Sequence, residues 1–476
     1  MALAMQTPAE RWAPGALADA ALARGDDAAA FSTLKVELRT CEVADRRADD
    51  CLHLLFLIAN AATGAGQPGE GERYARRALA MAEAVPGAGR DVATALNNLA
   101  NALEQQAKFA EAESAYRRAI SIWEAGGPGD AADVGTGLSN LGTLLAKQGR
   151  IAESEAMLRR ALALFRAARP ARPSDVRIAS NNLATALIDQ ARYPEAETLL
   201  RGVLRDAEAQ RSPGDPGVAT AYDNLAVALD EQGRLGDAEP MFRRALQLRR
   251  RWLPTGHPLI VTSLNNLAGN LNRQKRLGEA EGLLREALVL TERSVPAGHP
   301  AIGMRAHNLA FNLVDQQRFG EAEPLYRRAI ALFVAAFAPD HPAIATARHS
   351  LAICVDAQGR HDEAERLFRA ALAVRARFPS THPRRIDTLR DLGMNLIRRG
   401  QPGAEARSLL RAAQSGVLER MAGATGFTSA AQAELRNYRP LFTGVVRMSW
   451  LLASAERDGS ISVRAGAALA RPRSRR

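Results

Sequence analysis

The sequence predicts an all-α protein built as a solenoid of repeated helix pairs, and three observations support this prediction. Asparagine followed by leucine recurs six times at a step of 42 residues. Apolar residues lie seven positions before and four positions after each repeated leucine, a spacing that defines one face of a helix. Turn sequences follow, such as Gln-Gly-Arg at 148–150, 232–234 and 358–360. A fixed period indicates a stack of similar units rather than separate domains.

The first helix of each unit carries the repeated asparagine on its flank. The apolar positions before the leucine are Val92, Val134, Val176, Val218, Ile260 and Ile302, and those after it are Leu103, Leu145, Leu187, Leu229, Leu271 and Leu313. The repeated asparagines themselves are Asn98, Asn140, Asn182, Asn224, Asn266 and Asn308. Asparagine competes for backbone hydrogen bonds and is a mediocre helix former. Its recurrence at the same position of six helices therefore indicates a structural or binding role.

The second helix of each unit is marked by small residues that let helices approach closely. It opens at Ala112, Ser154, Ala196, Ala238, Ala280, Ala322 and Ala364. A Glu-Ala-Glu-like motif begins many of these helices, and a glutamate is followed four residues later by arginine in seven units, from Glu113 with Arg117 to Glu365 with Arg369. Glutamate ahead of arginine at this spacing is the favourable order on an exposed helix.

This pattern resembles the tetratricopeptide repeat, in the 42-residue variety of kinesin light chain. Leu267, Ala268, Leu271, Ala280 and Leu284 match the repeat signature, and Ala287 completes it. The resemblance implies eight tandem repeats over residues 91–415 that wind into a right-handed superhelix, with the first helices lining its concave surface. It also implies a module that binds proteins or peptides, without catalysis or cofactors.

The two ends of the sequence depart from the repeat. Residues 1–90 are expected to form irregular helical repeats that act as a cap, residues 416–456 a helical C-terminal segment, and residues 457–476 a basic disordered tail. Trp450, Phe442 and Val446 fall on one stripe of the C-terminal segment. This segment resembles the region after the repeats in bacterial proteins of the caspase-like CHAT type, in which a peptidase domain comes next, but we expect no peptidase domain in this chain.

The composition argues against several other classes of protein. A formal net charge of +11 is typical of nucleic-acid binders, but much of the arginine is expected to pair with glutamate, and no aromatic residues interleave with it. No nucleophile elbow, P-loop or metalloprotease motif is present, and Cys354 and His349 do not align on one helix face. The sequence therefore predicts neither an enzyme nor a nucleic-acid binder.

Four His-Pro pairs and three cysteines are further candidate sites. His257, His299, His341 and His382 recur too far apart to converge on one metal ion, so their prolines are expected at the first position of a helix. Cys41 and Cys51 are either unpaired core residues or a disulfide in an exported protein. No membrane span or secretory signal is recognisable, which predicts a cytoplasmic protein, or an exported one if the true start lies upstream.

The repeated asparagines are the candidate binding residues. Each asparagine lies on one flank of its helix, together with the residues four positions earlier and three positions later. The resemblance implies that this flank faces the groove. The candidate binding residues are therefore the six asparagines together with Thr136, Thr220 and Thr262. An asparagine amide can donate to and accept from a peptide backbone, so we predict a scaffold that binds an extended peptide. Two alternatives remain open: the asparagines bond only one another along the stack, or a separate effector contacts the C-terminal segment.

Overall fold

A computed structural model describes residues 15, 17–23, 26–43, 48–210, 216–400, 403–422 and 441. Within these residues every regular element is a helix, which confirms the predicted all-α class. The chain divides into two compact units, residues 1–266 and 267–476, with the division inside one helix. Each unit is described by itself.

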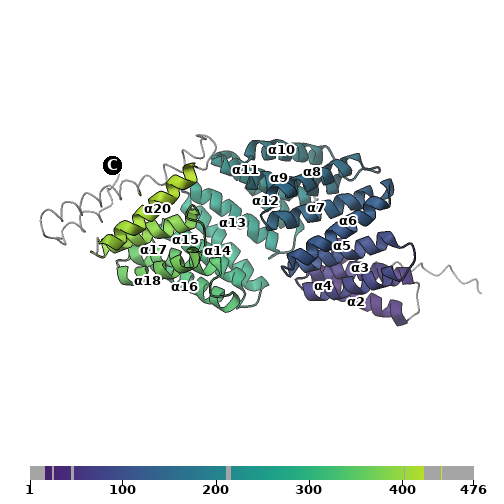
Figure 1. Ribbon diagram of the computed structural model, residues 1–476, viewed down its shortest axis with the longest axis horizontal. Coiled ribbons are helices and arrows are strands. Elements are labelled where there is room, and N and C mark those ends of the chain that lie inside the picture. Colours follow the sequence, from purple (N-terminus) through teal and green to yellow (C-terminus); the bar gives the residue numbers. More distant parts are fainter. Residues whose placement is uncertain are drawn as a thin grey trace, which may run out of the picture. The chain divides into compact units, whose positions relative to one another are not determined.

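The first unit begins with a short helix and an irregular pair, followed by regular pairs (Figure 1). Its helices are α1 (Asp19–Ala23), α2 (Asp27–Val43), α3 (Ala48–Gly64), α4 (Pro68–Glu83), α5 (Gly89–Gln105), α6 (Phe109–Ala125), α7 (Ala131–Lys147), α8 (Ile151–Ala167), α9 (Pro173–Asp189), α10 (Tyr193–Ala209), α11 (Pro216–Glu231) and α12 (Leu235–Trp252), with a short 3₁₀ helix η1 (Pro128–Asp130) before α7. Helix α13 (Pro258–Arg273) contains the division between the units.

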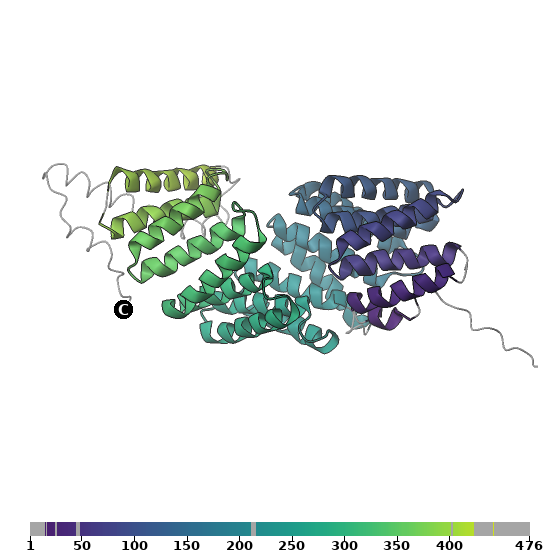
Figure 2. The same ribbon diagram turned by 90° about the horizontal axis from the view of Figure 1, so that it is seen from below.

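The second unit continues the same alternation of first and second helices. Its helices are α14 (Leu277–Ser294), α15 (Pro300–Asp315), α16 (Phe319–Ala336), α17 (Pro342–Ala357), α18 (His361–Arg375), α19 (Pro383–Arg398) and α20 (Ala404–Ala422). Consecutive helices within each unit lie alongside one another (Figure 2).

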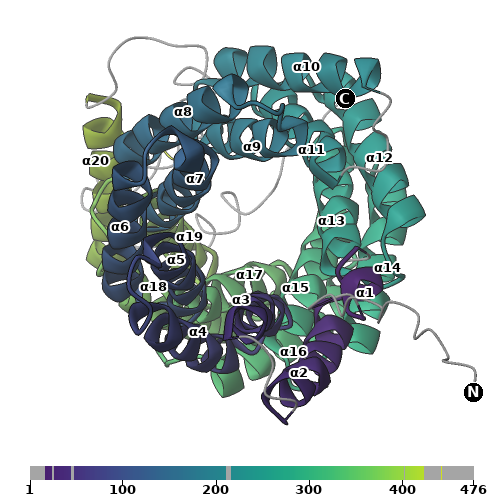
Figure 3. The same cartoon turned by 90° about the vertical axis from the view of Figure 1, so that its right-hand side faces the viewer.

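First helices also contact first helices, and this is what creates a continuous face. In unit 1, α5 contacts α3 and α7, and α9 contacts α7 and α11; in unit 2, α17 contacts α15 and α19. Figure 3 shows α5, α7 and α9 on the inner side of the curve that α6, α8 and α10 follow. The first helices of a unit therefore present one common surface.

The core of each pair is built from the repeated leucines and alanines. Leu141, Leu183 and Leu225 are at most 3% exposed, and Ala112, Ala196 and Ala238 are fully buried. Burying these side chains supplies the hydrophobic stabilisation of each pair. The turn after the first helix needs a left-handed residue, and Gly149, which has a φ of 77°, provides it at no steric cost.

The His-Pro pairs begin four of the first helices. Pro258, Pro300, Pro342 and Pro383 are the first residues of their helices, which confirms the sequence prediction. The preceding histidine caps the helix, because its Nδ1 accepts a hydrogen bond from the backbone N–H two residues later; for His299 and Ala301 this bond measures 3.1 Å. No group of three or more His, Cys, Asp or Glu in the described residues could hold a metal ion.

Cys41 and Cys51 form a disulfide that joins α2 to α3. The sequence left their state open, and the interpretation as two unpaired core cysteines is wrong. Their Cα atoms lie 5.8 Å apart, within the range that disulfides require. Cys354 is buried and free.

The C-terminal predictions fall largely beyond the described part of the chain. Helix α20 extends to Ala422, seven residues past the predicted end of the repeats at residue 415. Phe442, Val446 and Trp450 lie outside the described residues, as does the predicted tail at 457–476. Among the helices that are described, none is both long enough and apolar enough to cross a membrane.

Candidate functional site

The candidate site is the flank of the first helices that carries the repeated asparagines. We call it the asparagine face and define it by each repeated asparagine with the residues four before and three after it. In unit 1 it runs over α5, α7, α9 and α11, which contact one another in that order. Asn140, Asn182 and Asn224 are half-buried there, whereas Asn98 is buried.

Each repeated asparagine in this part of unit 1 donates a hydrogen bond to the preceding repeat. Asn140 Nδ2 donates to Asn97 Oδ1 at 3.0 Å, and Asn182 Nδ2 donates to Ser139 Oγ at 3.2 Å. Asn224 Nδ2 donates in the same way to the Asn181 carbonyl at 3.3 Å. The acceptor stands 43 residues earlier in all three cases. The asparagines therefore link adjacent repeats, as one of the sequence-based alternatives holds.

These links use only the donor side of the amide. Oδ1 of Asn140, Asn182 and Asn224 accepts no hydrogen bond from any residue that the structure describes. A carbonyl oxygen of this kind has two lone pairs. The face therefore keeps a row of acceptors, and a role in linking repeats leaves a role in binding possible.

The threonines of the face add further acceptors. Thr136 Oγ1 donates to the Ala132 carbonyl and Thr262 Oγ1 to the Pro258 carbonyl, each at 3.1 Å within its own helix. A hydroxyl that donates to the carbonyl four residues earlier can still accept a hydrogen bond through its oxygen lone pairs. Thr262 is exposed, and Thr136 and Thr220 are half-buried.

A polar hollow of about 270 Å³ opens on this face in unit 1. It brings the predicted Asn140 together with residues that the sequence did not single out as one site; the full lining is Asn60, Thr63, Asn101, Glu104, Gln105, Tyr116, Asn140 and Thr143. Asn101 and Thr143 lie on the face by its definition. Tyr116, by contrast, comes from the second helix α6, so its contribution depends on packing between helices.

The buried end of the hollow is a hydrogen-bonded cluster. The Tyr116 hydroxyl lies 3.0 Å from Glu104 Oε2 and also contacts Asn101 Oδ1. Burial and the Glu104 carboxylate raise the pKa of Tyr116, so the phenol stays protonated. Lys147 Nζ pairs with the Glu104 carboxylate at 2.6 Å. The charge of Lys147 is thus balanced within the protein.

The same flank is more apolar in unit 2. Met304 and Phe311 on α15 and Ile353 on α17 are 50%, 49% and 40% exposed, although they are large hydrophobic side chains. In unit 1 most of the equivalent positions hold Thr or Asn. His307, next to Asn308, is held by Ser350 at 3.1 Å, and burial lowers the pKa of His307 to about 4. His307 is therefore neutral at pH 7.

The second helices carry the ion pairs that the sequence predicted. All seven Glu–Arg pairs at i,i+4 are present, for example Glu155 with Arg159 at 2.8 Å. The sequence missed a second partner from the next repeat: Arg192 reaches Glu155 at 2.8 Å, and Gln190 donates to the same carboxylate. Many arginines are therefore paired, which leaves less free positive charge than the net charge implies.

The repeats also match a known family. Models described as tetratricopeptide repeat match residues 50–125, 134–169, 175–251, 231–293 and 304–377. These matches span more than half of the chain. The protein belongs to the tetratricopeptide repeat family. Repeats of this family typically mediate interactions between proteins.

Two solved structures share this fold at low sequence identity. The tetratricopeptide sensor protein PH0952 from Pyrococcus horikoshii, a signal transduction ATPase with numerous domains, matches with a TM-score of 0.52 and 12% identity over 78% of this chain and 55% of that one. The apo form of RapI matches with a TM-score of 0.51 and 13% identity over 76% and 96%. Kinesin light chain repeats from Podosopora anserina match at 22% identity with a TM-score of 0.39, over 44% and 98%. No curated protein sequence matches the chain.

Proposed function

We propose that this tetratricopeptide repeat protein is a non-enzymatic scaffold that binds an extended peptide segment of a partner protein on its asparagine face. The observation that carries the proposal is the row of acceptors on first helices that contact one another. These acceptors are the Oδ1 atoms of Asn140, Asn182 and Asn224, supplemented by threonine hydroxyl oxygens such as that of Thr136.

The chemistry of this row suits a peptide backbone. An extended peptide presents an N–H group at every residue, and each needs an acceptor when it leaves water. Side-chain amides held in place by the preceding repeat would meet such donors with little loss of conformational freedom, which favours binding. Recognition through the backbone requires no particular peptide sequence.

The charges and apolar groups of the face refine the kind of peptide. Because Lys147 is paired with Glu104, unit 1 offers no clear preference for an acidic ligand. In unit 2, taken by itself, the exposed Met304, Phe311 and Ile353 lie on α15 and α17, which contact each other. They favour a peptide with apolar side chains at that unit, since exposed apolar groups that gather on one face mark interaction sites. The disulfide between Cys41 and Cys51 is typical of oxidising compartments and favours export over the cytoplasm.

The test separates binding from repeat linkage. Peptides are selected from a random library on the full chain, and the affinity of the best binder is measured by fluorescence anisotropy. Replacing Thr136, Thr220 and Thr262 together by valine removes three hydroxyls while keeping side-chain shape. We expect binding to weaken by about 1 to 3 kcal/mol in total, at roughly 1 kcal/mol per effective hydrogen bond, with an unchanged melting temperature.

Changing Asn140 and Asn182 together to alanine serves as the companion variant. These asparagines link repeats as well as face the ligand, so we expect both peptide affinity and melting temperature to fall. If the threonine variant binds the selected peptide as tightly as the wild type does, the asparagine face is not the peptide site. A lower melting temperature with unchanged affinity in the asparagine variant would assign those residues to repeat linkage alone.

A further inference from the structure

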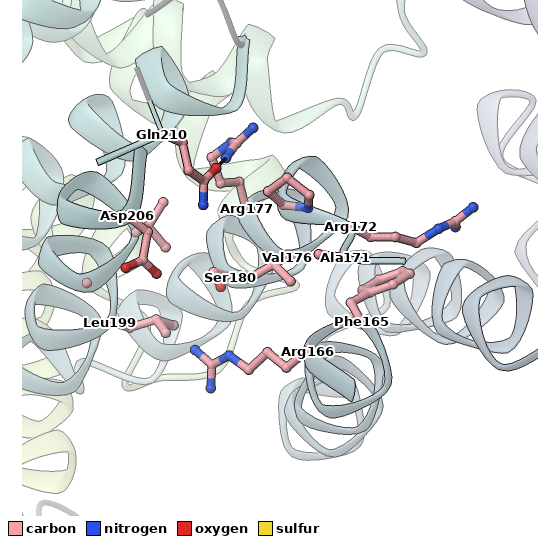
Figure 4. A pocket seen from close by; sticks show the side chains of 13 residues that line it. Phe165, Arg166, Ala171, Arg172, Val176, Arg177, Ser180, Leu199, Asp206 and Gln210 are labelled. Carbon is pink, nitrogen blue, oxygen red and sulfur yellow. Dashed lines mark hydrogen bonds between the residues drawn. The ribbon is translucent and has the colours of Figure 1, made fainter. Parts of the chain in front are cut away.

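A separate cavity of about 250 Å³ lies in unit 1 between α8, α9 and α10 (Figure 4). Phe165, Val176, Leu199 and Val203 give it apolar walls, and several polar and charged side chains complete the lining. Small-molecule sites combine an apolar lining with a few placed polar groups in this way. The cavity does not share residues with the asparagine face, and its function is independent of the peptide proposal.

Two positions of this cavity break the repeat. Ser180 stands in a column that holds Leu96, Leu138, Tyr222, Leu264, Ala306 and Arg348 in other repeats, and Asp206 stands where they have Leu164, Leu248 and Leu290. A repeat that only had to pack would be expected to keep an apolar residue at both positions, because an apolar side chain there contributes buried surface. Both departures face the same cavity.

Arg177 is a third departure from the repeat. The equivalent positions hold small residues, Ala93, Gly135, Ala219 and Gly303. Arg177 as a whole is only 4% exposed, and its guanidinium donates to Gln210 Oε1 at 2.9 Å and to Ser174 Oγ at 3.1 Å. Arg177 therefore forms a fixed polar part of the wall.

Ser180 supplies a polar group that its surroundings leave unsatisfied. Its side chain is fully buried, and its Oγ has no hydrogen-bond partner among the described residues. Burying a hydroxyl without a partner costs about 1 to 3 kcal/mol. A polar ligand atom in the cavity could form a hydrogen bond with this hydroxyl. Such a bond would explain why a serine stands at this position.

The cavity also presents charges of opposite sign. Arg166 extends from α8 and Asp206 lines the α10 side (Figure 4). Neither side chain forms an ion pair with any residue that the structure describes, in contrast to the paired arginines and glutamates along the second helices. Arg172, another lining residue, is paired with Asp175 at 3.1 Å.

We propose that this cavity binds a small zwitterion with an apolar body, of the size of a free amino acid. The carboxylate pairs with the Arg166 guanidinium, and the ammonium pairs with the Asp206 carboxylate. The apolar side chain packs against Phe165 and Val203, and the Ser180 hydroxyl completes the polar contacts. Arginine is well suited to bind a carboxylate, since its guanidinium donates two parallel hydrogen bonds.

The experiment uses the full chain and free amino acids as probes. All the common amino acids are screened by thermal shift, and those that stabilise the protein are titrated by calorimetry. We expect one or more apolar amino acids, such as leucine, to bind at a single site. Leucinamide lacks the carboxylate and 4-methylpentanoate lacks the ammonium, so each should bind at least roughly tenfold more weakly.

Variants then locate the site. Ser180→Leu restores the residue found in other repeats, so the protein should fold at least as well while the filled cavity no longer binds. Asp206→Asn preserves shape and should cost about tenfold in affinity for leucine while leaving 4-methylpentanoate unaffected. Glu208→Gln, on the same helix but outside the cavity lining, is the matched control and should bind as the wild type does.

Three results would overturn the proposal. The first is that no amino acid stabilises the wild-type protein or binds to it. The second is that 4-methylpentanoate binds as tightly as leucine, which would make the cavity a simple carboxylate site. The third is that Ser180→Leu retains wild-type affinity, which would place the binding elsewhere. None of these results bears on peptide binding to the asparagine face.

Discussion

At the scale of single residues, the most demanding feature is a buried charge pair in unit 1. Asp223 on α11 and Arg249 on α12 are each 5% exposed and form an ion pair, with Ser263 Oγ 3.2 Å from the Asp223 carboxylate. Equivalent positions of Arg249 hold Trp123, Phe165 and Phe333. Arg249→Phe should lower the free energy of unfolding by about 3 to 5 kcal/mol, because it leaves the Asp223 carboxylate buried and unpaired. Denaturant unfolding followed by circular dichroism measures this loss. The double variant Asp223→Asn, Arg249→Phe returns both positions to residues seen in other repeats and should recover most of the stability; a double variant as unstable as the single one would contradict this account.

At the scale of elements, the first helices of the later repeats depend on histidine caps. His299 Nδ1 accepts the Ala301 N–H at the start of α15, and Pro300 occupies the first helical position. His299→Ala should lower the stability of unit 2 by about 1 kcal/mol, the typical loss for a removed N-cap. His299→Asn should retain most of the stability, because asparagine is a good N-cap. Thermal unfolding of the three proteins gives the comparison. Equal melting temperatures for the alanine and asparagine variants would show that the imidazole acts through packing and not as a cap.

At the scale of the whole molecule, the glutamates of the second helices make folding sensitive to acid in both units. Burial raises the pKa of Glu155, but hydrogen bonds from Gln190, Arg159 and Arg192 outweigh it and lower this pKa to about 2; Glu281 and Glu323 reach a similar value. A carboxylate whose pKa is lower in the folded state contributes stability above its unfolded value near 4.5, and this contribution is lost as the pH falls toward 2. The melting temperature should therefore decline between pH 5 and about pH 2. The double variant Glu155→Gln, Glu323→Gln should have a lower melting temperature at pH 7 and a smaller decline in melting temperature between pH 5 and about pH 2. An unchanged dependence of the melting temperature on pH would exclude these glutamates as the cause of the decline.

The helix pairs could be predicted from the sequence because their signal is periodic. Leu141 and Ala196 each lie in a column of similar residues, so each column predicts the same helix in every repeat. The i,i+4 ion pairs were predictable for the same reason, since both partners lie on one helix. The contacts from Arg192 and Gln190 to Glu155 were missed because they depend on how one repeat is stacked on the next.

The candidate sites were only partly predictable. The asparagines stood out by repetition, but sequence could not decide between binding and linkage, because the acceptor of Asn182 lies in another repeat. The α8–α9–α10 cavity was missed altogether. In the sequence this cavity is marked only by residues that depart from the repeat, because Ser180 and Asp206 differ from the residues at equivalent positions of other repeats. Such single departures resemble random substitutions until the structure shows that both line one cavity.

Because the asparagine links recur at a constant spacing, one repeat can take the place of another at a junction. Asn182 donates to a residue 43 positions earlier, and that acceptor, Ser139, has its counterpart in Asn97 one repeat before it. If 42 residues between Asn97 and Asn182 were excised in frame, Asn182 would stand 43 positions after Asn97. Its Nδ2 could then donate to the Asn97 side chain, as Asn140 does. A gene can thus lose or duplicate a whole repeat and still leave the asparagine at the new junction with an acceptor, whereas an excision whose length is not a multiple of 42 residues would misplace that donor. Chain length in this protein is therefore open to evolution in steps of one repeat.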